Sequence, residues 1–85
     1  MEDSEILDAV CDACVELLKA DRSSLSTDTR FGDDLDADSL DLVEVVMSLE
    51  DRFGIAIPEE ELDGVETIGQ AVDAVQRRLA TEATA

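Results

Sequence analysis

The sequence predicts an all-α fold: a small four-helix bundle with a long loop between the first and second helices and a short third helix. Three observations predict it. Apolar residues recur at helical spacing, residues typical of helix starts and ends bound the periodic segments, and no segment alternates as a strand does. The 85 residues provide one compact core, so we expect a single domain over residues 1–85, with 81–85 as a frayed tail.

The first helix is predicted over residues 5–19, after Asp3 or Ser4 as its N-cap. Its polar residues fall opposite an apolar face, which comprises Leu7, Val10, Cys11, Cys14, Leu17 and Leu18. Cys11 and Cys14 form a C-x-x-C, but the chain has no histidine or second cysteine pair for zinc, and neighbouring acids disfavour a redox thiolate. We therefore interpret both cysteines as core residues.

Residues 21–37 are rich in Asp, Ser, Thr and Gly and lack any periodicity. This composition predicts a long loop. We expect the apolar residues in it to attach the loop to the core; they are Leu25, Phe31 and Leu35.

The second helix is predicted over residues 39–53, between Asp38 as N-cap and Gly54 at its end. At about 100° per residue it has two apolar stripes. The core-facing stripe comprises Leu42, Val45, Val46, Leu49 and Phe53. The second stripe lies opposite, is flanked by acidic residues, and comprises Leu40, Val43 and Met47. This second stripe is covered by the fold, is bound by a partner, or is ordinary apolar surface.

The two remaining helices are predicted from their first turns. Pro58 and the three glutamates after it suit the first turn of a short helix, which ends before Gly64. Thr67 and Gln70 form a capping box for the last helix. The apolar stripe of that helix comprises Ile68, Ala71, Val72, Val75 and Leu79.

The formal charge of −17 disfavours nucleic acid and anionic membranes as partners and favours proteins with basic patches. No basic segment precedes an apolar one at the N-terminus, and no apolar run could cross a bilayer. We therefore expect a cytoplasmic monomer. The preference for Arg over Lys, with abundant Ala, Val and Asp, suits a GC-rich bacterial genome.

Ser39 is predicted in the first turn of the second helix, where backbone N–H groups lack helical partners and the helix dipole is positive. A phosphate ester on its hydroxyl would find donors there. A serine at this position is also a common helix-start residue, so position alone leaves both interpretations open.

The residues around Ser39 favour the first interpretation. The run Leu35-Asp36-Ala37-Asp38-Ser39-Leu40-Asp41-Leu42-Val43-Glu44 resembles the signature of the acyl carrier protein family around its modified serine. The resemblance continues through the segment 47–58 and the capped helix start at 67–72, and covers most of residues 31–79.

The resemblance implies that Ser39 accepts 4'-phosphopantetheine from coenzyme A through a separate magnesium-dependent phosphopantetheinyl transferase, with Asp38 helping to place metal and phosphate. The arm would end in a thiol that carries acyl groups, so the chain itself would not be an enzyme. The resemblance also implies a face for acyl-loading and synthase enzymes with basic docking patches, formed by Leu40, Asp41, Val43, Glu44, Met47, Glu50 and Asp51. In one departure, Asp36 stands where the family commonly has glycine, although aspartate tolerates unusual backbone angles better than most residues.

Other functions compete with this one. The alternating Asp34, Asp36 and Asp38 suggest a calcium loop, but Ser39 and Val45 would stand where an EF-hand needs glycine and glutamate. A non-covalent acidic interaction module would explain the charge and the two stripes. Within the carriers, composition favours polyketide, antibiotic or related natural-product biosynthesis over fatty acid synthesis, and Ala37 before Asp38 disfavours a peptidyl carrier.

Overall fold

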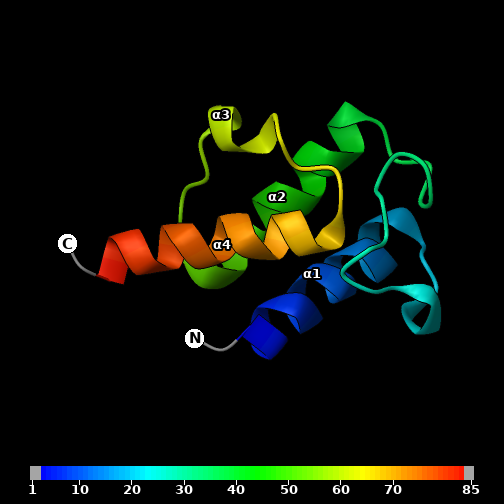
Figure 1. The fold of residues 1–85 in the computed structure, drawn as a ribbon, viewed down its shortest axis with the longest axis horizontal. Coiled ribbons are helices and arrows are strands. Elements are labelled where there is room, and N and C mark those ends of the chain that lie inside the picture. Colours follow the sequence, from blue (N-terminus) through cyan, green and yellow to red (C-terminus); the bar gives the residue numbers. More distant parts are fainter. Residues whose placement is uncertain (1–2, 84–85) are drawn as a thin grey trace.

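The structure, a computed structural model, describes residues 3–83 of the chain and contains four α-helices and one short 3-10 helix over that range. The α-helices are α1 (Asp3–Leu18), α2 (Ser39–Phe53), α3 (Glu59–Leu62) and α4 (Ile68–Ala83), and the 3-10 helix is η1 (Arg22–Ser24). The predicted all-α fold with a long loop and a short third helix is confirmed (Figure 1). None of the helices in this range is long and apolar enough to cross a membrane.

Helix α1 lies at the centre of the packing, since it contacts both α2 and α4, whereas the short α3 contacts α4. The shared core is aliphatic; its largest fully buried side chains are Ile6, Leu49, Ile68, Val10, Val45, Val75, Cys11 and Cys14. The long loop between α1 and α2 covers the end of the bundle where α2 and α4 begin (Figure 1). The fold therefore places the start of α2 beside this loop.

The loop is bonded to the bundle by its backbone as well as by its apolar side chains. The N–H of Phe31 donates to the carbonyl of Glu66 at 2.9 Å, and the N–H of Ile68 donates to the carbonyl of Thr29 at 2.9 Å. Leu25 and Phe31 are buried and Leu35 packs against the core, which confirms the predicted attachment. These bonds tie the segment before α2 to the start of α4.

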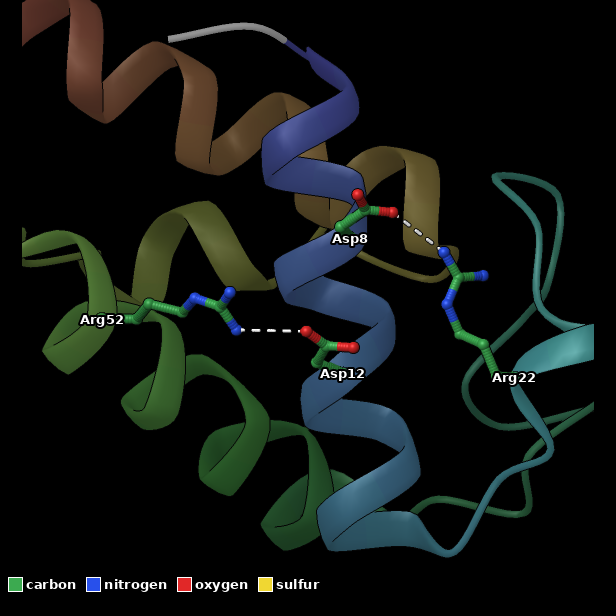
Figure 2. Close-up of polar contacts among 4 residues, drawn as sticks. All are labelled: Asp8, Asp12, Arg22 and Arg52. Carbon is green, nitrogen blue, oxygen red and sulfur yellow. Dashed lines mark hydrogen bonds and ion pairs between the residues drawn. The ribbon is translucent and has the colours of Figure 1, made fainter.

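Two exposed ion pairs join other segments to α1 (Figure 2). Arg22 of η1 lies 2.9 Å from Asp8, and Arg52 near the end of α2 lies 3.4 Å from Asp12. Because exposed pairs contribute less than about 1 kcal/mol each, they orient the segments more than they stabilise the bundle.

Several predicted helix boundaries were wrong. Helix α1 already includes Asp3 and Ser4, so neither is its N-cap, and it ends at Leu18 because Lys19 adopts a left-handed φ of 60°. Pro58 is the N-cap of α3 and not its first residue.

Residues 81–83, part of the segment expected to be a frayed tail, are helical in this structure. Helix α4 continues to Ala83, and the hydroxyl of Thr81 donates to the carbonyl of Arg77 at 2.9 Å, one turn earlier. Residues 84–85 lie outside the described part of the chain.

Candidate functional site

Ser39 is the first residue of α2, and its side chain is exposed. Neither its N–H nor that of Leu40 donates to another residue of the segment 3–83. These are the donors that a helix start leaves unpaired, and they lie at the positive end of the dipole. An anionic group on the Ser39 hydroxyl therefore has donors within reach.

A capping box sets the position of Ser39. Asp38 is the N-cap, with extended backbone angles, and its Oδ1 accepts the N–H of Asp41 at 2.9 Å. In return, Oδ2 of Asp41 accepts the N–H of Asp38 at 3.2 Å. Both predicted ends of this helix are confirmed, because Gly54 follows it in the left-handed conformation with φ 66°.

Asp36 has a φ of 58°, so the left-handed angle that glycine would relieve is present. Two residues later the chain reaches the N-cap, and the N–H of Ala37 between them donates to the carbonyl of Phe31 at 2.8 Å. The turn at Asp36 therefore directs the chain into α2.

We expect Asp36→Gly to be more stable than Asp36→Val by about 1–2 kcal/mol, because a β-branched side chain opposes this φ and glycine does not. Both variants remove the same carboxylate, so their difference in urea denaturation reports the backbone angle. Equal stabilities would contradict a conformational role for this position.

A cavity of about 340 Å³ opens beside Ser39. Its apolar wall includes Phe31, Leu42 and Val65, from the loop, α2 and the segment before α4. Its polar lining includes Arg30 and Glu66. Residues far apart in the sequence thus line one open cavity, and Ser39 is among them.

The alternating aspartates of the calcium hypothesis have other functions in this structure. Asp34 Oδ2 accepts the N–H of Arg30 at 2.8 Å, Asp38 caps α2, and Asp36 adopts the left-handed turn. Among residues 3–83, no group of three or more His, Cys, Asp or Glu side chains is placed to hold a metal ion. The structure supports a turn and a cap at these positions.

A sequence profile described as "Phosphopantetheine attachment site" matches residues 8–75, which is most of the chain. The chain belongs to the acyl carrier protein family. Curated proteins named "Acyl carrier protein" agree with this assignment. One from Lactobacillus johnsonii is 41% identical over 89% of this chain and 95% of its own length. One from Prochlorococcus marinus is 42% identical over 92% of this chain and 98% of its own length. One from Rubrobacter xylanophilus is 43% identical over 88% of this chain and 93% of its own length.

Membership of this family implies a covalently attached 4'-phosphopantetheine as the prosthetic group of this acyl carrier protein. The residues at the start of α2 fit such a group, because they offer an exposed hydroxyl, unpaired N–H donors and an adjoining cavity. The group supplies the thiol that holds an acyl chain as a thioester. Phosphopantetheinyl transferase and acyl-handling enzymes are the partners that the family implies.

The second apolar stripe of the carrier's α2 is exposed. Leu40 is 74% exposed, Met47 58% and Val43 37%, so the stripe is left open to solvent within residues 3–83, least at Val43. Glu44 and Asp51 are also exposed beside the stripe. The opposite face is buried through Val45, Val46 and Leu49 and half-buried through Leu42 and Phe53, as predicted.

Two predicted face residues make bonds within the carrier. Asp41 is half-buried and completes the capping box. Glu50 is also half-buried, and its Oε2 accepts the N–H of Ile57 at 2.7 Å. Glu50 therefore holds the segment after α2 in place, a contact that helical periodicity does not indicate.

The two cysteines of the carrier are free and buried, as predicted for core residues. Burial, together with a smaller contribution from the neighbouring Cys11, raises the pKa of the Cys14 thiol to about 11. Burial also raises the pKa of Cys11, against the opposing effect of the Arg22 guanidinium. Neither thiol is a reactive nucleophile at neutral pH, which suits a protein whose cargo is a thioester.

The sequence did not indicate that Arg30 lines the same cavity as Ser39. The loop bonds to Glu66 and Ile68 bring it there, and these depend on α4. One signal was available: Arg30 is the only basic residue between positions 23 and 51.

Proposed function

We propose that this acyl carrier protein bears its 4'-phosphopantetheine on Ser39 and presents acyl intermediates, held as thioesters on the arm, to separate enzymes. The observation that carries the proposal is the exposed hydroxyl at the first position of α2, inside the matched family region. The Ser39 oxygen takes the phosphopantetheinyl group from coenzyme A, adenosine 3',5'-bisphosphate leaves, and the hydroxyl proton is released. Asp38 keeps one carboxylate oxygen for the cap, and the other is available to a transferase-bound metal.

We expect incubation with coenzyme A, Mg²⁺ and a broad-specificity phosphopantetheinyl transferase to raise the intact mass by one phosphopantetheinyl group. Ser39→Ala should abolish the gain, because the acceptor oxygen is removed while the cap and the core are kept. Intact-mass spectrometry measures both results.

Ser48→Ala on the same helix is the matched control and should load like the wild type. An unchanged wild-type mass with several active transferases, or full loading of Ser39→Ala, would contradict the proposal.

The exposed stripe supports a docking role for α2. Leu40, Val43 and Met47 supply apolar contact area, and Met47 is a flexible side chain that can adapt to several partners. Glu44 and Asp51 supply charge for steering partners with basic patches. Asp41 and Glu50 contribute less, because each carboxylate accepts a backbone N–H of the carrier itself.

We expect Glu44→Lys and Asp51→Lys to slow loading by the transferase, on the order of tenfold at low ionic strength and less at high salt. Both side chains are exposed, so helical circular dichroism should be unchanged. Asp73→Lys, at an exposed position on α4, makes the same charge change away from the stripe and should load faster than either variant. Equal rates for all three would place the docking face elsewhere.

For the pathway, we propose polyketide or related natural-product biosynthesis, supported by the preference for Arg over Lys and the charge of −17. The general name of the relatives favours fatty acid synthesis as the second candidate. Complementation of a bacterium depleted of its own fatty acid carrier separates the two: restored growth favours the second candidate, and no growth with a fully loaded protein favours the first.

The chain's own part in this proposal is non-catalytic, since the reactive thiol belongs to the arm. We also propose that it acts as a cytoplasmic monomer.

A further inference from the structure

Arg30 is the one basic residue that lines the cavity beside Ser39. The remaining lining is acidic or neutral and includes Asp33, Asp38 and Glu66. The other basic residues of the chain lie just after α1, in η1, in the last turn of α2 and in α4; they are Lys19, Arg22, Arg52, Arg77 and Arg78.

An anion on Ser39 would join a strongly acidic surface. Asp36, Asp38 and Asp41 flank the position in sequence, and their repulsion opposes the attraction of the helix start. A cation near the serine would offset this repulsion, and Arg30 lines the same cavity as Ser39.

The guanidinium of Arg30 has N–H donors that are available to a further acceptor. Its Nη1 lies 3.1 Å from Oδ2 of Asp33, in a pair that is exposed on both sides. No bond from its Nε or Nη2 is formed within residues 3–83. An arginine fork can contact a carboxylate and a phosphate oxygen together, and an exposed pair is easily exchanged.

The cavity wall suits the part of the arm that follows the phosphate. That part is a pantoyl unit with two methyl groups on one carbon, directly after the phosphodiester. Phe31, Leu42 and Val65 provide an apolar wall beside the serine. The acyl end of the arm is much farther from the attachment point along the chain of bonds.

We propose that Arg30 binds the phosphodiester on Ser39 and that the apolar wall of the cavity receives the dimethyl carbon of the arm. Arg30 is then a positioning residue that holds the base of the arm against the loop. This inference rests on the attachment of the arm to Ser39.

The test compares apo and loaded protein. We expect loading to raise the urea midpoint of the wild type and Arg30→Gln to lose most of that rise. In the loaded wild type, nuclear Overhauser effects should join the two arm methyls to the Phe31 ring, and they should disappear in Arg30→Gln.

Two control variants isolate the guanidinium. Arg77→Gln removes one positive charge away from the cavity and should keep the rise. Asp33→Asn breaks the ion pair of Arg30 but leaves the guanidinium, so it should also keep the rise. If apo Arg30→Gln does not fold, Arg30→Lys is used in its place. A smaller rise in the urea midpoint on loading, with weaker contacts from the arm methyls, supports the proposal. A rise and methyl contacts equal to those of the wild type overturn it.

A loaded wild type without these methyl contacts, or a rise unchanged in Arg30→Gln, would overturn the inference while leaving the proposed function intact. Contacts from the acyl chain alone would identify the cavity as a cargo site and also overturn it. Loss of the rise in Asp33→Asn would show that the ion pair, and not contact with the arm, is responsible. A wild type that cannot be loaded would overturn both proposals.

Discussion

Leu49→Ala should lower the free energy of unfolding by about 3 kcal/mol, which is a large part of the stability of a domain this small. Leu49 is 1% exposed, and it lies on the core-facing stripe of α2 among close-packed aliphatic side chains. Its truncation removes buried apolar area and leaves a cavity that the neighbouring helices fill only in part. Urea denaturation followed by circular dichroism measures the loss.

Met47→Ala, two residues earlier on the same helix, is the matched control. Met47 is 58% exposed, so we expect its truncation to change stability by less than about 0.5 kcal/mol and to slow loading by the transferase. The two variants should therefore separate the two stripes, one acting on stability and the other on recognition. A large stability loss in Met47→Ala, or wild-type stability in Leu49→Ala, would contradict this division.

The second large effect is expected at alkaline pH. Burial raises the pKa of Cys14 from 9.0 to about 11 in the folded protein, whereas the unfolded chain ionises near the ordinary value. Above pH 9 the unfolded state therefore binds fewer protons than the folded state, and stability falls as pH rises. The loss between pH 9 and 11 should be on the order of 2 kcal/mol, with a smaller effect in the same direction from Cys11.

This alkaline range is simple to interpret in this chain, because the sequence has no Tyr and only one Lys that could titrate beside the two thiols. Cys14→Ala should flatten the dependence of unfolding free energy on pH between 9 and 11, although it lowers stability at neutral pH. Cys14 should also resist iodoacetamide in the folded protein and react once urea is added. A wild-type slope in Cys14→Ala would contradict the assignment to this thiol.

The start of α2 was predictable because its determinants are local. Asp38 and Asp41 are three residues apart, so one carboxylate can cap the helix start and the other can complete the box. The left-handed angle at Asp36 was indicated only by the family resemblance, in which glycine is common at this position. Ser39 could therefore be assigned to the first turn before any long-range contact was known.

The boundaries that were wrong depend on weaker local signals. Asp3 and Ser4 suit either a cap or a first turn, and nothing in the sequence chooses between these positions. The 3-10 turn at Arg22–Ser24 was not predicted, and Oδ1 of Asp21 caps it by accepting the N–H of Ser23 at 3.1 Å. A short polar segment has no periodic apolar residues from which such a turn could be predicted.

By itself, the sequence determined the helical class, the exposed serine at a capped helix start and the two stripes of α2, because capping and helical period act over a few residues. Only the tertiary structure decided that Arg30, Phe31 and Val65 enclose a cavity beside Ser39 and that Glu50 bonds to Ile57. The physical reason is that these contacts require the long loop to reach the start of α4 and the chain to fold back after α2. Helical periodicity in the sequence does not predict which distant segments contact one another.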